Sequence, residues 1–453
     1  MTDLLAAAPP PPLSGHPLLT FLLQVGLLLG AAFLLGRLAM RFGMPAIAGE
    51  LTVGIILGPS LLSGLLPDLG GWLSVDQVHL LDAVGQFGVL MLVAISGMHL
   101  DRSLVRRHGT TALTVGAAGV VLPLGLGIGA GLLLADSLRE PGSDAIVFAL
   151  FLGVAMCVSA IPVIAKTLID MNLMHRKIGQ LILVSGTISD AFGWLMLPMV
   201  TAMATTGLSG GNVAVAIITP VAVFAGSPLV GRLVINPLMG WAHRSGGDSA
   251  PVVTTVVLVI FAAAGTHALG LEAILGAFLV GWLIGAAPGG RPGWTAPVES
   301  ITLYVFAPIF FATAGLRMDL TALADPETLA IALAIVVLAI VGKFLGAAIG
   351  GLMSGLTRWE SLALGAGMNA RGVVEVIIAM VGMRLGILST EAYTIIVLVA
   401  VVTSLMAPPL LRLAMRHTVE DSPEDLARTR PIGDRAEPVA APVDVGGGQG
   451  SKL

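Results

Sequence analysis

The sequence predicts an all-α membrane protein with 13 transmembrane helices. Its 453 residues are 56% hydrophobic and only 11% charged, with a mean hydropathy of +0.96. Soluble domains carry about 25% charged residues, so this composition excludes an ordinary soluble fold. The apolar residues gather in runs long enough to cross a bilayer, and Lys and Arg gather in alternate loops between the runs.

Each of the 13 apolar runs predicts one helical span. The runs cover residues 19–40, 45–63, 79–98, 110–135, 145–166, 177–204, 212–233, 251–269, 271–287, 298–316, 328–353, 359–383 and 392–415. The eighth and ninth runs are the least clearly divided, because only Gly270 and Glu272 interrupt them. The 58 Gly and 27 Pro residues suit close helix contacts and broken helices in lipid.

The basic residues of the loops set the orientation of these spans. The alternate loops that carry most of them hold Arg37, Arg41, Arg102, Arg106, Arg107, Lys166, Arg176, Lys177, Arg232, Arg244, Arg291, Arg358, Arg412 and Arg416. The opposite loops hold only Arg139, Arg317 and Arg384. The positive-inside rule makes the first set cytoplasmic. The N-terminus is then outside and the C-terminus inside, which requires an odd number of spans.

Three regions follow from this arrangement. We expect an extracellular segment over residues 1–18, a transmembrane unit over 19–417 and a disordered cytoplasmic tail over 418–453, which is rich in Pro, Gly and charged residues. The first run is expected to remain as a span, because no basic n-region of a signal peptide precedes it. ATP-driven transport is not expected, because the chain has no Walker motif.

Three charged side chains lie deep inside apolar runs. Asp190 is near the middle of the sixth run, Lys343 lies in the eleventh and Arg371 in the twelfth. A charge at the bilayer centre costs roughly 3 kcal/mol or more on insertion scales. Such residues mark ion or proton pathways, so the pattern favours a protein that moves ions or protons.

Two runs carry signals that interrupt a helix. Pro162, in the fifth run, lacks a backbone donor and clashes with the preceding turn. In the twelfth run, Gly367, Asn369 and Gly372 favour unwinding. Irregular backbone survives at this depth only when it is buried in protein or lines a cavity. Paired interruptions in two halves of a chain point to an inverted repeat with an ion site between them, in which spans five and six correspond to spans twelve and thirteen.

These features resemble the monovalent cation/proton antiporter superfamily, on the branch of the Kef-like exchangers and the plant cation/proton exchangers called CHX. The resemblance covers roughly residues 19–416 and rests on the order and spacing of short segments. These are MPAIAGEL at 44–51, GPS at 58–60, VSAIPVIAK at 158–166, SD at 189–190 with Trp194, FFATAGL at 310–316, GKFLG at 342–346 and MNARGVVE at 368–375.

The resemblance implies an NhaA/NapA-like antiporter fold with inverted repeats and two crossing discontinuous helices. A dimerisation domain would comprise approximately spans 1–3 and 8–10, and a core ion-transport domain approximately spans 4–6 and 11–13, with span 7 as the link. It also implies a homodimer in the cell membrane whose core moves like an elevator.

Site roles are implied in the same way. Asp190 matches the essential carboxylate that binds cation and proton in competition, and Ser159 matches part of the cation-coordinating break. Ser189 stands where many sodium exchangers have a second acid or an asparagine. Lys343 matches a lysine that engages an Asp-Asp pair, and the absence of that pair favours electroneutral exchange. Arg371 matches an arginine that is more often structural than ion-binding.

The chemistry of cation binding points to the same residues. An alkali cation that has lost its water needs hard oxygen ligands. Asp190, Ser189 and Ser159 can supply them, and so can Thr187, which precedes Asp190 by three residues on nearly the same helical face. Burial disfavours a charged carboxylate, so a proton or a cation would neutralise it. Only the loaded group would cross the apolar barrier cheaply, which couples the two fluxes.

The remaining buried charges need partners. Glu375 follows Arg371 by four residues and lies on the same helical face, so we expect the two to pair structurally. Lys343 is expected to be either a structural counter-ion or a group that titrates. Glu50 and Glu272 lie near span ends, where we expect solvated or capping carboxylates.

The sequence therefore predicts a secondary active antiporter, not an enzyme, that exchanges protons for K+ or Na+ at Asp190. Three alternatives stay open: a proton-coupled exporter of a small organic molecule on the same scaffold, a gated cation efflux pathway, and a membrane sensor without transport. We expect no cofactor and no nucleic-acid partner. Sodium and potassium are not distinguished by the sequence.

Overall fold

The computed structural model describes residues 15–42, 44–58, 75–99, 102–171, 173–174, 176–207, 210–245, 247, 249–287 and 293–418. Most of the predicted extracellular segment, and the predicted tail beyond its first residue, lie outside these residues. The described part is nearly all helical, and its one β-type pairing is an isolated antiparallel bridge between Arg139 and Leu388. The all-α prediction is confirmed for this part of the chain.

The helices follow the apolar runs closely. They are α1 (Gly15–Arg41), α2 (Ala46–Leu57), α4 (Val75–Met98), α5 (Arg102–Leu138), α6 (Ala145–Cys157), α7 (Ile161–Asp170), α8 (Lys177–Thr206), α9 (Gly210–Val230), α10 (Asn236–Arg244), α11 (Ser249–Ala268), α12 (Ala273–Gly285), α13 (Ala296–Ile301), α14 (Ala307–Gly315), α15 (Pro326–Met353), α16 (Arg358–Met368), α17 (Val373–Arg384) and α18 (Thr390–Met415). Short π-helical turns, Gly231–Ile235 and Thr302–Phe306, join α9 to α10 and α13 to α14.

Each of the 13 predicted runs contains a helix or a helix pair. Among the described residues, nine helices are long and apolar enough to cross a membrane, and the bent pair of α16 and α17 adds a tenth. The helices α2, α6 and α12 are apolar but only 12 or 13 residues long. At 1.5 Å per residue each covers about 20 Å, less than the hydrocarbon core of about 30 Å. The multi-pass prediction is confirmed, and the number of 13 crossings stays a prediction.

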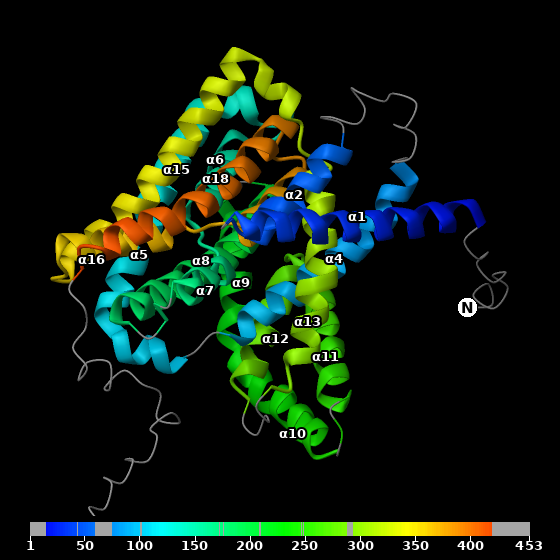
Figure 1. The fold of residues 1–453 in the computed structure, drawn as a ribbon. Coiled ribbons are helices and arrows are strands. Elements are labelled where there is room, and N and C mark those ends of the chain that lie inside the picture. Colours follow the sequence, from blue (N-terminus) through cyan, green and yellow to red (C-terminus); the bar gives the residue numbers. More distant parts are fainter. Residues whose placement is uncertain are drawn as a thin grey trace, which may run out of the picture.

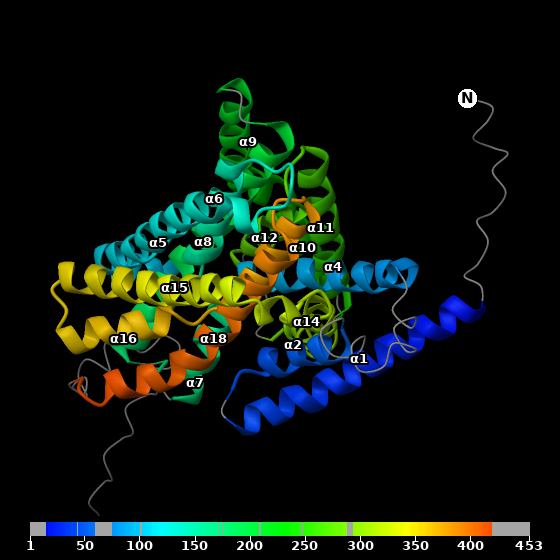
Figure 2. The ribbon, with the colours of Figure 1, turned by 90° about the horizontal axis from the view of Figure 1, so that it is seen from above.

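The helices form two groups that lie side by side (Figures 1 and 2). The broken-helix group contains α5 to α8 and α15 to α18, with α15 packed along α5 and α16 packed against α15 and α18. The flanking group contains α1, α2, α4 and α10 to α14, with α12 packed on α4 and α14 packed on α2. The groups meet where α8 packs against α12 and where α14 packs against α17.

Glycines permit close contact along α15. A side chain at Gly346 would collide with the Ala118 carbonyl of α5, and one at Gly342 would lie 3.2 Å from the Pro123 Cα. Small residues let helices approach in this way in membranes, where dispersion contacts rather than hydrophobic burial hold helices together. This contact sets the position of Lys343, which follows Gly342 on α15.

Both interrupted helix pairs begin with a capped end. Asp144 accepts hydrogen bonds from the backbone N–H groups of Ile146 and Val147 at the start of α6, at 2.7 and 3.3 Å. A capping box of Thr357 and Glu360 starts α16. Such caps satisfy the first free N–H groups of a helix. The opposite ends of α6 and α16 have no such local device, because they end inside the protein.

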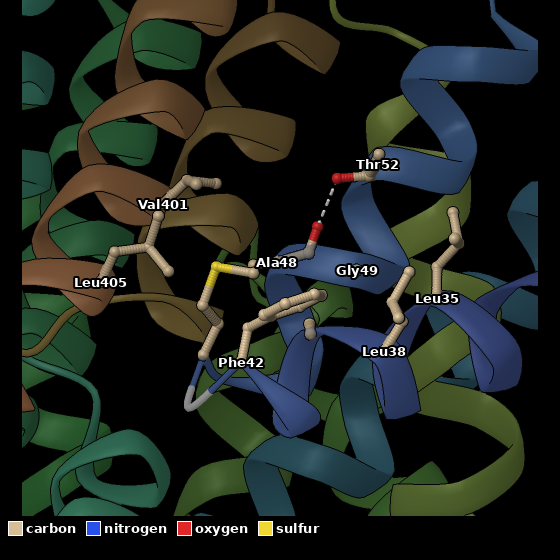
Figure 3. Close-up of a pocket in the computed structure, with 10 residues that line it drawn as sticks. Leu35, Leu38, Phe42, Ala48, Gly49, Thr52, Val401 and Leu405 are labelled. Atoms are coloured by element: carbon tan, nitrogen blue, oxygen red, sulfur yellow. Dashed lines mark hydrogen bonds between the residues drawn. The ribbon is translucent and has the colours of Figure 1, made fainter.

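An apolar groove of about 300 Å³ lies where α1 and α2 meet α18 (Figure 3). Its lining residues are Leu35, Leu38, Ala39, Phe42, Met44, Ala48, Gly49, Thr52, Val401 and Leu405. Thr52 has the one polar side chain in this lining, and its hydroxyl donates to the Ala48 carbonyl at 2.6 Å. Such a surface gives a dehydrated cation almost no oxygen ligands, so this groove is not a suitable ion site.

Candidate ion-binding site at the crossing of two broken helices

Two helix interruptions meet inside the broken-helix group. The first separates α6 from α7 and consists of residues 158–160, and the second separates α16 from α17 and consists of residues 369–372. The Ala160 N–H donates to the Ala370 carbonyl at 3.1 Å, and the Ser159 hydroxyl donates to the Met368 carbonyl at 3.1 Å. The two unwound segments therefore bind one another, as expected for crossing discontinuous helices.

The interruptions lie slightly away from the residues that signalled them. Pro162 is the second residue of α7, so the break precedes it; the first turn is where a helix tolerates proline. Gly367 lies inside α16, where a side chain would collide with Ile182 of α8. The expectation that Gly367 unwinds the helix is therefore wrong, because that glycine is needed for close packing. Gly372 lies in the break, with a φ of +154° that other residues rarely adopt.

Lys343 compensates the end of the first broken helix. Its side chain is fully buried, and its ammonium group donates to the Cys157 carbonyl, at the last residue of α6. The last carbonyls of a helix lack internal partners and carry partial negative charge. A cation placed there satisfies both deficits, which supports the interpretation of Lys343 as a structural counter-ion in this conformation.

Arg371 and Glu375 form the expected pair, and both side chains are fully buried. The guanidinium group lies 3.3 Å from a Glu375 carboxylate oxygen and also donates to the Ala339 carbonyl at 2.8 Å. The second Glu375 oxygen accepts the Gly372 N–H at 2.8 Å, at the start of α17. The pair thus ties the second break to α15 and places a negative charge at a helix N-terminus, where it is favourable.

Asp190 lies on α8 beside the first break. Gly186 and Gly193 lie four residues before and three after it, on the same helical face. A side chain at Gly186 would collide with Ile164 of α7, and one at Gly193 would collide with Val158 in the break. On either side of Asp190, α8 is therefore packed closely against the first break and the first turn of α7, and that turn carries no acidic residue of its own. That positive helix end favours an anion.

The polar atoms around Asp190 lack protein partners. Its carboxylate is fully buried, and neither oxygen has a hydrogen-bond partner among the described residues. The same is true of the Ser189 hydroxyl and of both polar atoms of the Asn369 side chain. Buried polar atoms are nearly always satisfied, by protein, water or an ion. Unsatisfied oxygens occur both on α8 and in the second break, and each of them needs water, an ion or a shifted side chain as a partner.

The predicted ligands differ in whether their oxygens already have hydrogen-bond partners. Asp190 and Ser189 have free oxygens, whereas the Ser159 hydroxyl proton is used to bridge the two breaks. Thr187 is only half-buried, and its hydroxyl donates to the Leu183 carbonyl of its own helix at 2.9 Å. Asn369, expected to be structural, has an amide oxygen without a partner among the described residues, so it is a better candidate ligand than Thr187. Whether an amide is left without a partner depends on packing, so no sequence pattern could have identified Asn369 as a ligand.

The charges of the site balance. Asp190 lies within electrostatic reach of Lys343 and Glu375. When all four groups are ionised, the negative charges of Asp190 and Glu375 equal the positive charges of Lys343 and Arg371, so the net charge is zero. Lys343 and Arg371 are bonded to backbone carbonyls or to Glu375, so within the described residues Asp190 is the member without a bonded partner.

Three buried polar residues were not expected from the sequence. Glu272 is the N-cap residue of α12, near a span end as expected, but its side chain makes no capping hydrogen bond and is not solvated: it is buried and pairs with Arg384, with an N–O distance of 2.6 Å. Glu50 is also buried, at 9% exposure, rather than solvated. Ser404 of α18 donates to the Arg371 carbonyl. These roles depend on which helices become neighbours, and neither sequence spacing nor composition reports that.

Comparison with known proteins agrees with this architecture. Residues 28–416 match the family described as sodium/hydrogen exchanger, transmembrane. The chain is 30% identical over 400 residues to the Na(+)/H(+) antiporter NhaS4 of Synechocystis, covering 87% of this chain and 97% of that protein. It is 28% identical over 404 residues to cation/H(+) antiporter 17 of Arabidopsis thaliana, covering 87% of this chain and 48% of that protein. The chain thus spans about half the length of the plant relatives that it matches.

A solved structure shares the fold. The sodium proton antiporter MjNhaP1 of Methanocaldococcus jannaschii superposes with a TM-score of 0.63 at 18% identity, covering 90% of this chain and 99% of that one. The family match extends over both broken helices and Asp190. This chain is a member of the sodium/hydrogen exchanger family, within the monovalent cation/proton antiporter superfamily.

Proposed function

We propose that this protein is a secondary active antiporter that exchanges protons for a monovalent cation, K+ or Na+, at Asp190. One observation carries the proposal: Asp190 is a fully buried carboxylate without a partner among the described residues, at the crossing of two broken helices. A permanently empty, charged carboxylate there would be expensive. A proton or a monovalent cation removes that cost, and each can replace the other.

The relatives support both candidate cations. NhaS4 is named a Na(+)/H(+) antiporter, the Bacillus cereus protein GerN a Na(+)/H(+)-K(+) antiporter, and a Saccharomyces cerevisiae relative K(+)/H(+) antiporter 1. The latter two are 28% and 27% identical to this chain. At this distance the names support the class of substrate, a monovalent cation with a proton, and leave the choice of cation to experiment.

The coupling follows from the charges. With Asp190 unloaded, moving its carboxylate through an apolar barrier would cost several kcal/mol, whereas the loaded group is neutral. Asp190 supplies the charged ligand, and the oxygens of Ser189, Asn369 and Ser159 complete the shell, with Thr187 a less suitable candidate. Since Ser189 is not an acid, one proton exchanges for one cation, and the exchange is electroneutral.

The proposed movement uses the two groups of helices. The broken-helix group would form the core that moves in the manner of an elevator, and the flanking group would hold a homodimer together in the cell membrane. In this proposal the core comprises the expected spans 4–6 and 11–13, and the dimerisation domain comprises the expected spans 1–3 and 8–10. The proposed chain crosses the membrane 13 times within residues 19–417, with its N-terminus outside and its C-terminus in the cytoplasm.

Reconstituted vesicles test the assignment of Asp190. A proton gradient is set up across the membrane, Na+, K+, Li+ or Rb+ is added outside, and a pH dye reports exchange. We expect Asp190→Asn to abolish cation-dependent proton movement, because an amide neither binds a proton nor neutralises a cation. Asp136→Asn is the matched control, since that carboxylate at the end of α5 is 96% exposed.

The outcomes separate the alternatives. Cation-dependent proton movement that persists in Asp190→Asn contradicts the proposal. Cation flux that needs no proton gradient indicates a gated efflux pathway instead, and proton movement driven only by an organic solute indicates an exporter. Clamping the membrane potential checks the stoichiometry, because electroneutral exchange does not respond to it.

A further inference from the structure

Trp194 is a further residue of α8 whose polar group has no partner in the described part of the chain. Its side chain is 2% exposed, and its indole N–H has no hydrogen-bond acceptor among the described residues. An indole nitrogen is a donor only, so it can bind a carboxylate or a water oxygen but never a cation. A buried donor left unmade is costly, which calls for an acceptor in some state of the protein.

Among the side chains of α8, the oxygen acceptor closest in sequence to Trp194 is the Asp190 carboxylate. The two residues are four apart, so they lie on one face of α8, separated by about one turn. Both Asp190 oxygens lack a donor among the described residues, as the Trp194 nitrogen lacks an acceptor. Two complementary unsatisfied groups on one helical face are satisfied together by a direct hydrogen bond after a small side-chain rotation, or through one water.

The Trp194 ring also has a defined neighbour. It stacks on Phe278 of α12, with ring centroids 5.7 Å apart and the ring planes at 29°. Phe278 is itself 2% exposed. The pair therefore joins the helix that carries Asp190 to the flanking group. Its two parts can be removed separately: the N–H by replacing Trp194 with Phe, and the stack by replacing Phe278.

We infer that Trp194 is a positioning residue that sets the cation affinity, because its indole N–H stabilises the unloaded carboxylate of Asp190. This inference rests on the proposed function of Asp190. A bound cation neutralises the carboxylate and takes its oxygens, so the N–H stabilises the empty site more than the loaded one. Removing the N–H therefore makes cation binding tighter. The effect is confined to affinity, since an aromatic ring at position 194 can still stack on Phe278.

Binding and transport of the full-length protein test the inference at one fixed pH, chosen high enough that a further rise in pH no longer changes the half-saturating cation concentration, so that protons do not compete for Asp190. Cation binding is measured as the rise in melting temperature with added NaCl or KCl in detergent, against choline chloride at equal ionic strength, and exchange is measured in vesicles. We expect Trp194→Phe to lower both the half-saturating cation concentration and the KM about tenfold, the scale of one hydrogen bond to a charged group.

Phe278→Leu is the matched control. It removes the stack and keeps the indole N–H, so we expect an unchanged half-saturating concentration, with any change confined to the maximal rate. A purely structural role for Trp194 predicts that both variants act alike on rate and stability, without tighter binding. An unchanged or higher half-saturating concentration in Trp194→Phe overturns the inference.

Asp190→Asn separates this inference from the function on which it rests. If the cation-dependent rise in melting temperature disappears in Asp190→Asn while Trp194→Phe matches the natural protein, only the inference about Trp194 fails. If the rise persists in Asp190→Asn, the cation does not bind at Asp190, and the proposed function and the inference fail together.

Discussion

Replacing Arg371 with Met removes one charge from a buried pair and leaves the other. Of its partners among the described residues, the fully buried Glu375 carboxylate then keeps the Gly372 N–H, at 2.8 Å. The Met side chain fills part of the vacated volume, so the main loss is electrostatic. The carbonyl of Ala339, which Arg371 also binds, stays within a regular helix and loses less.

The magnitude follows from the burial of both partners. Removing one member of a fully buried ion pair costs about 3–5 kcal/mol, since it leaves a charge without compensation. Glu375→Gln should cost less, about 1–3 kcal/mol, because its amide oxygen can still accept the Gly372 N–H and Arg371 keeps its carbonyl acceptors. In Arg371→Met/Glu375→Gln no buried charge is left unpaired, so the double variant should be more stable than Arg371→Met alone by 1 kcal/mol or more, on the order seen when buried pairs are replaced together.

The assay is the free energy of unfolding in mixed micelles of a mild detergent and SDS, for the natural protein and the three variants. The cycle isolates the interaction between the two side chains. A double variant that loses the sum of both single losses would refute the reasoning, because Arg371 and Glu375 would then act independently. Leu133→Ala, at an 86% exposed position on α5, controls for loss of an apolar contact outside the site.

Three further perturbations test other parts of the molecule. Lys343→Met should leave the Cys157 carbonyl without its donor and destabilise the protein by about 1–3 kcal/mol, while Lys343→Arg should retain most of the stability; equal losses in the unfolding assay would contradict a role in compensating the end of α6. Gly372→Ala forces a side chain into a φ of +154° and should cost about 1–3 kcal/mol by the same assay, whereas an unchanged protein would show that the break relaxes freely. Cysteines at Glu272 and Arg384, joined by a short bis-methanethiosulfonate cross-linker that spans the length of the two natural side chains, should stop exchange until a reductant is added, because the pair joins the start of α12 to the end of α17 across the two groups. Exchange that continues after complete cross-linking would show that the groups do not separate there.

The sequence alone determined the membrane character and most of the helices. Long apolar runs must form helices in lipid, because no water is present to satisfy backbone groups. Even the weakest predicted division was correct: α11 ends at Ala268 and α12 begins at Ala273, with Gly270 at a φ of +75° between them. Asp190 could likewise be identified from the sequence as a candidate functional residue, because a charge within such an apolar run is costly however the chain folds.

One local pair was predicted correctly although its helical premise was wrong, because Arg371 lies in the break before α17 and not on the helix that carries Glu375. Arg371 and Glu375 are four residues apart, and they pair as expected. The breaks were located to within a few residues, although Gly367 packs against Ile182 inside α16 instead of unwinding it. A glycine that permits close helix packing and a glycine that interrupts a helix look the same in the sequence. Which role a glycine has depends on the helix that packs against it.

Only the tertiary structure decided which groups are satisfied. Lys343 binds a carbonyl 186 residues away, and Glu272 pairs with a residue 112 positions along the chain. The oxygens of Asp190, Ser189 and Asn369 likewise lack partners among the described residues because of the way the helices pack. Periodicity reports the face of a helix on which a residue lies, but hydrogen bonds between distant segments depend on which faces meet, and that is a property of the folded chain.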